Sequence, residues 1–433
     1  MAKKTVSVFW FRRDLRLHDN HGLFRALEGE HPVLPVFIFD KDILSNLSDK
    51  ADRRVTFIHD CLGRMQEKLT EAGSSLHVLF DTPARAFATL LEEYDVRAVY
   101  TNHDYEPYAI ARDKKIGDWL TKKGISFHSF KDQVIFERSE VMKGDGTPYT
   151  IFTPYSRVWK QKFSETKVVS FPSEKRMDRF VNLKTLRIPS LADIGFKEAD
   201  LHVPEPSWKK QTVVNYDKTR NFPSVDGTTR LSVHLRFGTV SVRKLAVTAS
   251  ELSEVWLNEL IWREFFMMIL FHFPAVVDHS FKRKYDNIKW RNNEKEFEKW
   301  CKGETGYAIV DAGMRELNQT GFMHNRVRMV VASFLTKHLL IDWRWGEAYF
   351  AEKLLDYELS ANNGNWQWAA GCGCDAAPYF RVFNPYEQEK KFDPDRKYIT
   401  KWVGSDYNLT PMVDHVMARK RALEVYKAGV EQG

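Results

Sequence analysis

The chain has 433 residues, of which 43% are hydrophobic, and this is enough for two or three domains with a large core. Charged residues make up 28% and are spread along the sequence, which excludes wholesale disorder, and no apolar run is long enough to span a bilayer. The net charge of +7 is compatible with a polyanionic partner without requiring one, whereas an aromatic content of 14% favours stacking on planar heterocycles.

Strand-like and helix-like segments alternate over the first part of the chain. The stretches "TVSVFWF" and "PVLPVFIFD" are rich in β-forming residues, and the start of the chain makes a poor signal peptide but a plausible first strand. The stretch "RRVTFIHDCLGRMQEKLTEAG" has apolar residues at helical spacing and ends on Gly73. This alternation predicts an α/β domain over residues 1–130, with a parallel sheet covered by helices on both faces.

The periodicity then weakens and changes. Residues 131–215 are polar and punctuated by proline, which predicts a long connector wrapped on the surface. From residue 216 onward the strand signals nearly vanish, and long helical patterns such as "EVWLNELIWREFFMMILFHF" dominate. We therefore expect a larger all-α domain over residues 216–433, large enough to enclose a cofactor.

Several common signatures are missing. Neither GxGxxG nor GxxxxGK[ST] occurs, although the arginines of "WFRRDLRLHDN" follow the first strand, where α/β sheets usually bind ligands. The four cysteines, at positions 61, 301, 372 and 374, make no CxxC pair and resemble no disulfide framework. We expect reduced thiols and no metal site.

One stretch of the helical part places charges on an apolar helix. Trp256, Glu259 and Arg263 are three and four residues apart and share one face, and the surrounding residues are those of a buried helix. A buried carboxylate and guanidinium need partners. The pattern fits either an internal Glu–Arg pair or a functional site.

A second stretch, "GFMHNRVRMVV", mixes polar and apolar residues in a similar way. Asn325, Arg328 and Met329 share one helix face, which suggests an anion or a polar heterocycle nearby. The same pattern also fits ordinary salt bridges to acids such as Asp356.

Two further stretches are notable for their polar side chains, one at an expected helix start and one rich in amides. In "VDGTTRLSVHLRFG", Thr228 and Thr229 stand where a helix is expected to begin, which fits a phosphate site or a plain helix cap. The stretch "LSANNGNWQWAAG", from Leu359 to Gly371, holds two tryptophans, three asparagines and a glutamine. Amides are costly to bury without partners, so this stretch requires a specific role.

Together these stretches resemble the photolyase/cryptochrome family of flavoproteins, and most of all the class I DNA photolyases that repair cyclobutane pyrimidine dimers. The resemblance runs from "VFWFRRDLRLHDN" through "TGYAIVDAGMRELNQTGFMHNRVRM" to "ANNGNWQWAAGCGCDAAPYFRVFNP" and covers nearly the whole chain. It implies an α/β domain, a long connector and a helical domain that binds FAD and DNA. It also implies light-dependent repair by electron transfer from reduced FAD (FADH⁻) to a dimer flipped out of the duplex, which costs least for damaged bases.

The resemblance implies two sets of FAD contacts. The residues expected around the phosphates and ribityl chain are Tyr216, Thr228, Thr229, Arg230, Leu231 and Ser232. The residues expected around the flavin are Trp256, Glu259, Arg263, Asn325, Arg328, Asp356, Glu358 and Asn362. Asn362 would face flavin N5 with a neutral amide, which favours reduced flavin.

The resemblance also assigns roles in the reaction. The expected catalytic residues are Glu259, Asn325, Met329 and Asn362. The expected electron-transfer residues are, from the flavin outward, Trp366, Trp343 and Trp300, with the last near the surface. Trp262 and Trp368 are expected to clamp the flipped-out dimer, and Arg326 to contact a phosphate beside the lesion.

Other expectations are less specific. Glu106 resembles a folate-contacting position, so a methenyltetrahydrofolate or deazaflavin antenna could occupy the N-terminal domain. We expect a monomer that acts on UV-damaged DNA without a membrane, located in the cytoplasm with the bacterial nucleoid, or in the nucleus if the source is eukaryotic.

Two other functions stay open. A cryptochrome blue-light receptor is disfavoured by Asn362, by the intact pocket and by the absence of a signalling tail. A (6-4) photolyase is disfavoured because Asn325 and Met329 replace a histidine pair, while His324 is expected to be structural.

The sequence also departs from the family pattern. Glu358 stands where similar proteins have aspartate, and Asn365 replaces a glycine. The sequence "GCGCD" replaces a serine/threonine-rich version. The stretch between Trp402 and Pro411 is shortened, which leaves the C-terminal packing open.

Overall fold

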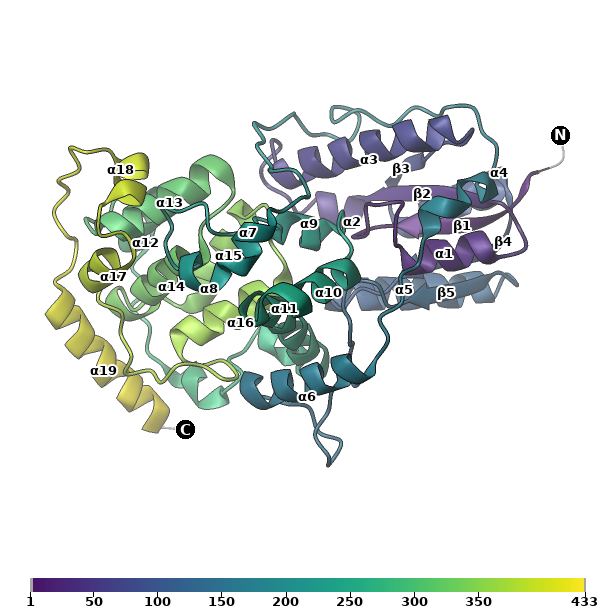
Figure 1. The fold of residues 1–433 in the computed structure, drawn as a ribbon. Coiled ribbons are helices and arrows are strands. Elements are labelled where there is room, and N and C mark those ends of the chain that lie inside the picture. Colours follow the sequence, from purple (N-terminus) through teal and green to yellow (C-terminus); the bar gives the residue numbers. More distant parts are fainter. Residues whose placement is uncertain (1–2, 432–433) are drawn as a thin grey trace. The chain divides into compact units, whose positions relative to one another are not determined.

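The computed structural model describes residues 3–431, which form two compact units (Figure 1). Unit 1 contains the residues up to Glu137, together with Phe163–Pro206 and Leu231–Thr248. Unit 2 contains Arg138–Lys162, Ser207–Arg230 and the residues from Ala249 onward.

Unit 1 is built on a five-stranded parallel sheet. Its strands are β1 (Thr5–Phe11), β2 (Val33–Asp40), β3 (His77–Asp81), β4 (Asp95–Asn102) and β5 (Ser126–Phe130), in the order β3-β2-β1-β4-β5. The chain moves outward from β1 to β3 and returns to β4 on the other side of β1, so right-handed crossovers place helices on both faces. The prediction of a parallel α/β sheet is confirmed.

Helices cover this sheet and complete unit 1. They are α1 (His21–Glu28), α2 (Lys41–Leu44), α3 (Arg53–Glu71), α4 (Pro83–Glu93), α5 (Pro107–Thr121), η1 (Ser173–Arg179), α9 (Ser232–Phe237) and the first part of α10 (Val242–Leu252). Phe87 of α4 and Leu120 of α5 join one core cluster with Val8 of β1, so these two helices cover the same face. Strands β1 and β2 are buried on both faces, which explains their nearly continuous apolar runs.

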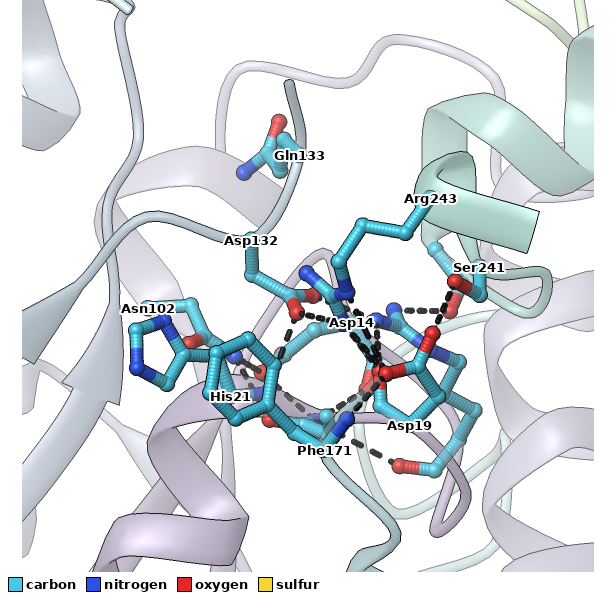
Figure 2. A network of polar contacts seen from close by, with 12 residues as sticks. Asp14, Asp19, His21, Asn102, Asp132, Gln133, Phe171, Ser241 and Arg243 are labelled. Carbon is cyan, nitrogen blue, oxygen red and sulfur yellow. Dashed lines mark hydrogen bonds and ion pairs between the residues drawn. The ribbon is translucent and has the colours of Figure 1, made fainter. Parts of the chain in front are cut away.

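A buried polar network attaches later segments to this sheet (Figure 2). Arg243 of α10 donates to Asp19 Oδ1 at 3.0 Å and to Asp132 Oδ1 at 2.9 Å. Arg16 donates to Asp132 Oδ2 at 2.6 Å, and the backbone N–H of Phe171 donates to Asp19 Oδ1 at 2.7 Å. Because buried charges are costly to leave unpaired, these contacts fix both segments beside the carboxyl edge of the sheet.

Unit 2 is helical. Its α-helices are α6 (Phe152–Glu165, which ends in unit 1), the second part of α10, α7 (Lys210–Val214), α8 (Tyr216–Thr219), α11 (Glu254–His272), α12 (Glu294–Lys302), α13 (Ala308–Thr320), α14 (Asn325–Ser333), α15 (Trp343–Lys353), α16 (Leu359–Ala370), α17 (Pro385–Phe392), α18 (Lys397–Val403) and α19 (His415–Glu431). Its shorter turns are η2 (Pro274–Val277), η3 (Arg283–Asn287) and the π-helix η4 (Phe334–His338). The expected all-α part is confirmed.

The division of the chain differs from the predicted consecutive segments 1–130, 131–215 and 216–433. Part of the expected connector is helix α6, whose Trp159 donates from Nε1 to Glu264 of α11 at 2.5 Å within unit 2. Residues 231–248 lie in the range expected for the helical domain but pack in unit 1. Both placements result from contacts with residues that are distant in the sequence. Such contacts cannot be predicted from the local periodicity of these segments.

The shortened stretch over residues 402–411 packs against the start of α13. The hydroxyl of Tyr407 donates to buried Asp311, and the Met412 N–H donates to Thr305 O at 2.9 Å. Asp311 also accepts from the hydroxyl of Thr305 at 2.6 Å. The C-terminal packing that the sequence left open is therefore made by a compact set of buried hydrogen bonds.

Within residues 3–431, no helix is both long and apolar enough to cross a membrane, and no group of three or more His, Cys, Asp or Glu side chains could hold a metal ion. The cysteines are free thiols, and burial raises the pKa of Cys61 to about 11 and of Cys372 to about 12. Thiols with such pKa values are unreactive at neutral pH.

Two buried histidines predict a loss of stability in acid. Burial lowers the pKa of His324 to about 4 and of His338 to about 3, from the ordinary value of 6.5. The unfolded chain therefore binds more protons than the folded chain below pH 6.5, and stability falls as the pH falls from 6.5 toward 4. These two histidines together should lower the free energy of unfolding by up to about 2.7 kcal/mol per pH unit, at about 1.36 kcal/mol per proton.

Chemical denaturation at several pH values measures this slope. The replacement His338→Gln should reduce it, because one of the groups with a lowered pKa is lost. A free energy of unfolding that stays constant between pH 6.5 and 4.5 would contradict the prediction.

Candidate functional site

The candidate site is centred on one face of helix α11. Ser253 caps the helix by accepting the N–H of Trp256 at 3.3 Å. Trp256 is buried, and Glu259 and Arg263 are half-buried on the turns that follow. The cation that pairs with Glu259 is Arg220, which follows α8 and lies outside the helix of Glu259.

Burial and a neighbouring cation act on Glu259 in opposite directions. Burial raises the pKa of the Glu259 carboxyl above its usual range, and the charge of Arg220 opposes this shift. The pKa of the Tyr216 hydroxyl is also raised, by burial and by the charge of Glu259. A carboxyl group with a raised pKa can donate a hydrogen bond as well as accept one, which suits contact with the polar edge of a nucleobase.

Helix α14 presents the other residues of the predicted pocket. Asn325, its first residue, is exposed, and Met329 is half-buried one turn later. His324 caps the helix, since its Nδ1 accepts the N–H of Arg326 at 3.2 Å. The guanidinium of Arg326 donates to Asn221 Oδ1 at 2.7 Å, so this expected phosphate contact is held by a neighbouring side chain.

Arg328 and Asp356 form the ion pair that the sequence left as one alternative. Arg328 donates from Nη2 to Asp356 Oδ2 at 2.8 Å and from Nε to Met323 O at 2.7 Å. Asp356 Oδ1 is buried and accepts no hydrogen bond from any residue in 3–431, and the same holds for Asn258 Oδ1 on α11. Buried acceptors without donors are costly, so both oxygens fit a ligand that presents N–H groups, as a flavin ring does.

Glu358 caps helix α16, the helix formed by the amide-rich stretch. Its carboxylate accepts the N–H of Ala361 at 2.9 Å and the hydroxyl of Ser360 at 2.5 Å. Glutamate can therefore replace the aspartate of similar proteins because its extra reach still closes the first turn of the helix.

The amide of Asn362 is held in one orientation. Its Nδ2 donates to the backbone oxygen of Glu347 at 3.1 Å and to Glu347 Oε1 at 3.0 Å. With both amide hydrogens directed at the same residue, the carbonyl oxygen of Asn362 points away from Glu347 and remains an acceptor. This orientation suits the expected contact with a protonated ring nitrogen.

The segment expected around the FAD phosphates does not begin a helix at its threonines. Thr228 and Thr229 lie in an irregular segment, and α9 begins only at Ser232, after the N-cap residue Leu231. Arg230 adopts a φ of 51°, which is incompatible with a right-handed helix, so the helix starts later than expected. Residues 231 and 232 belong to unit 1, and the phosphate cradle stays a prediction.

The three predicted electron-transfer tryptophans are all buried, with exposures of 2% for Trp366, 1% for Trp343 and 0% for Trp300. The ring of Trp300 lies 6.1 Å from that of Trp366, measured between centroids. The rings of Phe297 and Tyr349 each lie 5.8 Å from Trp300. Trp300 is therefore an inner neighbour of Trp366, and the expectation that it lies near the surface is wrong.

Gly346 creates the space that the Trp366 ring occupies, and this gives a testable expectation. A Cβ at position 346 would lie 2.1 Å from Trp366 Cη2 and 2.6 Å from Leu335 Cδ2. Gly346→Ala should lower the free energy of unfolding by about 1–3 kcal/mol through overpacking. It should also slow photoreduction of the bound flavin, because the indole must move.

A matched control is Gly63→Ala in α3, where a Cβ would meet nothing within 4 Å. This change should leave photoreduction unaltered and stabilise the helix by up to about 1 kcal/mol. Calorimetry and the rate of flavin bleaching under blue light measure both effects. Equal melting temperatures for Gly346→Ala and the parent protein would contradict the expectation.

The two tryptophans expected to clamp the substrate lie on neighbouring helices. Trp262 on α11 and Trp368 on α16 are both half-buried, and α11 packs against α16 in unit 2. The ring of Phe152 stacks on Trp262 with centroids 3.7 Å apart and planes 3° apart. Sequence spacing gave no signal for this stack, since the two residues are 110 positions apart.

Glu106, the position expected to contact an antenna, is engaged by two arginines within unit 1. Its Oε1 accepts from Arg13 Nη1 at 2.9 Å and from Arg236 Nη1 at 2.9 Å. Arg13 also pairs with Asp104 at 3.0 Å. The arginines after β1 thus make ion pairs in this structure.

Arg220 and Glu347 are among the site residues that sequence reasoning missed. Arg220 pairs with Glu259 from a turn with no motif, and nothing local could have shown its partner. Glu347, which orients Asn362, directly follows Gly346 on α15. A carboxylate beside a glycine on a tryptophan-rich helix was the one available signal.

Comparisons with known proteins agree with this geometry. Residues 7–174 match the DNA photolyase family, and residues 256–409 match the family described as the FAD binding domain of DNA photolyase. The chain is 37% identical to the deoxyribodipyrimidine photo-lyase of Synechococcus sp., over 92% of this chain and 87% of that protein.

Two solved structures are also similar. One is a bacterial class III photolyase from Agrobacterium tumefaciens, with a TM-score of 0.83, 31% identity, and coverage of 100% of this chain and 99% of that one. The other is an archaeal photolyase from Sulfolobus tokodaii with two FAD molecules, with a TM-score of 0.81, 35% identity, and coverage of 98% and 99%. From the two family matches, the identity along almost the entire chain and the buried acceptors that fit a flavin, it follows that this chain belongs to the DNA photolyase family of FAD-binding DNA-repair lyases.

Proposed function

We propose that the chain uses light to repair cyclobutane pyrimidine dimers in DNA. The observation that carries this proposal is the chemical character of the residues at the start of α14, which belong to the predicted pocket. Asn325 and Met329 cannot exchange protons, and His324 is buried with its Nδ1 used as a helix cap. Opening a cyclobutane ring requires an electron, whereas a (6-4) lesion requires acid–base chemistry on a hydroxyl group, so this pocket favours the dimer.

In the proposed reaction, bound FAD in its reduced form supplies the electron on illumination. Asp356 and Asn258 would accept hydrogen bonds from the flavin ring, and Asn362 would present the carbonyl that Glu347 orients. Glu259 would hold a proton at the polar edge of the flipped-out base, as its raised pKa allows. Trp262 and Trp368 would stack on the dimer.

The route for reducing oxidised FAD begins, in this proposal, at Trp366 and continues to Trp343. Trp300 is too buried to be the outer end, and the half-buried Trp290 takes this place. The segment after Trp290 is joined to the start of α15, because Asn292 accepts the N–H of Asp342 at 2.9 Å. Trp343 directly follows Asp342 in the sequence, so this hydrogen bond links the segment of Trp290 to the helix that begins with Trp343.

A signalling cryptochrome is the second candidate, because it would use the same flavin and tryptophans. A neutral amide at position 362, oriented by Glu347, favours retention of reduced flavin, which repair requires and signalling does not. The orientation of Asn362 thus supports repair.

We also propose that an antenna chromophore in unit 1 would bind at Glu106. It would displace one of the two arginines from this carboxylate and donate hydrogen bonds from its own N–H groups. Both Arg13 and Arg236 already occupy that carboxylate. The absorption spectrum of the purified protein tests this directly, since a folate or deazaflavin adds a band that FAD lacks.

The repair activity is tested with the purified protein, its flavin reduced without oxygen, and oligothymidine that contains cyclobutane dimers. Recovery of the ultraviolet base absorbance under blue light, but not in the dark, is the expected result. A matched oligonucleotide with a (6-4) lesion should show no recovery. A photoreducible flavin without recovery on either substrate would overturn the repair proposal and favour the cryptochrome.

A further inference from the structure

The indole of Trp262 is held by aromatic rings from a distant part of the sequence. Phe152, the first residue of α6, stacks face to face on it at 3.7 Å. Phe265 meets it edge-on at 5.6 Å, and Phe266 lies at 5.5 Å with a tilt of 29°. Trp262 itself remains half-buried, so part of its surface is accessible while its plane is fixed.

Two contacts hold Phe152 in place: one is made by its own backbone N–H and the other by a side chain one turn later on α6. Its N–H donates to Asp375 Oδ2 at 3.1 Å, which places a carboxylate at the N-terminus of α6. One turn later Tyr155 packs against Phe265 of α11 at 5.2 Å. The stack on Trp262 is therefore one of two aromatic contacts between α6 and α11.

The hydrogen bond between Phe152 and Asp375 also connects α6 to the helix that carries Trp368, the other tryptophan expected to clamp the dimer. Asp375 lies in the loop that follows α16, and α16 carries Trp368 in its last turn. The start of α6 is thus attached to the end of the helix that bears Trp368, while its first side chain sets the plane of Trp262. The positions of Trp262 and Trp368 therefore both depend on the contact between the start of α6 and the loop after α16.

We propose that Phe152 is a positioning residue, which fixes the plane of Trp262 and so increases the preference for dimer-containing DNA over undamaged DNA. This inference rests on the proposed function. An indole that must stack on a flipped-out base loses rotamer freedom on binding, and the Phe152 stack removes that freedom in advance. Contacts to the phosphates do not discriminate lesions, so binding to undamaged DNA should not depend on Phe152.

The test compares Phe152→Leu with Phe152→Tyr in the flavin-loaded protein. Binding to a dimer-containing oligonucleotide and to its undamaged equivalent is measured by fluorescence anisotropy. Phe152→Leu keeps apolar volume but loses the planar stack, and its preference for damaged DNA should fall about three- to tenfold. Phe152→Tyr keeps the ring and should restore the preference.

Tyr155→Leu is the matched control, because it removes a buried ring of the same helix that contacts Phe265 and not Trp262. It should lower the melting temperature at least as much as Phe152→Leu while leaving the preference for damaged DNA unchanged. Loss of preference in both variants would overturn the inference, since general loosening of α6 would then explain it.

Two further outcomes separate this inference from the proposed function. If the unmodified protein prefers dimer-containing DNA and Phe152→Leu prefers it equally, the positioning role is wrong and the repair proposal stands. If the unmodified protein shows no preference, the repair proposal and this inference both fail.

Discussion

Replacing Trp366 with phenylalanine should abolish light-driven reduction of the bound flavin, while repair by the chemically reduced protein should continue. Phenylalanine is far harder to oxidise than tryptophan, so the first step of the electron route is lost. The ring at 366 is 2% exposed and packs edge-on against Phe350 at 5.0 Å, so the variant retains most of its packing. Bleaching of oxidised flavin under blue light, with an external thiol as electron source, measures the effect.

Trp345→Phe is the matched control for this experiment. Trp345 lies on α15, is half-buried and contacts Phe297 at 5.2 Å, and it has no place in the proposed route. Its flavin should bleach at the rate of the parent protein. Undiminished bleaching in Trp366→Phe would remove Trp366 from the route and require another donor.

The same assay distinguishes between Trp343 and Trp300 as the residue that follows Trp366 in the route. Trp343→Phe should block photoreduction, whereas Trp300→Phe should slow it only slightly, because Trp300 is enclosed and leads to no exposed indole in the proposed route. The opposite ranking would place the route through Trp300, whose ring lies 6.1 Å from Trp366.

Replacing Glu259 with alanine should reduce dimer repair by on the order of tenfold or more, while the flavin stays bound. The variant loses the group that would hydrogen-bond the base as negative charge develops on it. Glu259→Gln should retain more activity, because an amide still donates a hydrogen bond. Repair yield per absorbed photon is the measurement, and flavin content is determined from the visible spectrum.

The pH dependence of repair adds a second readout for Glu259. Burial raises the pKa of this carboxyl, so the parent protein should lose repair as the pH rises through that pKa and the proton leaves. Glu259→Gln has no such proton and should show a flatter profile. Repair by Glu259→Ala at the parent level would exclude the carboxyl group from the mechanism.

The sheet and the long helices could be predicted because their signals are local. The apolar run of β2 and the 3.6-residue pattern of α3 are each read from consecutive residues. Helix α7, which lies within the expected connector, gave no such signal, because its five residues are too few to show a period. Such elements form because tertiary contacts stabilise them.

The candidate site divides in a similar way. The face shared by Trp256, Glu259 and Arg263 follows from helical spacing alone. That Glu259 pairs with Arg220, and that Trp300 is enclosed rather than exposed, follow from chain segments tens of residues away. No spacing rule encodes the partner of a side chain across such a distance.

The sequence by itself therefore determined the two kinds of fold and the family, because these are carried by local periodicity and by long ordered motifs. Only the tertiary structure decided which side chains are held in one orientation and which are shielded from solvent. Glu347 sets the amide of Asn362, Phe152 sets the plane of Trp262, and Asp356 keeps a buried oxygen without a donor among the described residues. Orientation and desolvation depend on neighbours brought together by packing, and for that reason they appear only once the chain is folded.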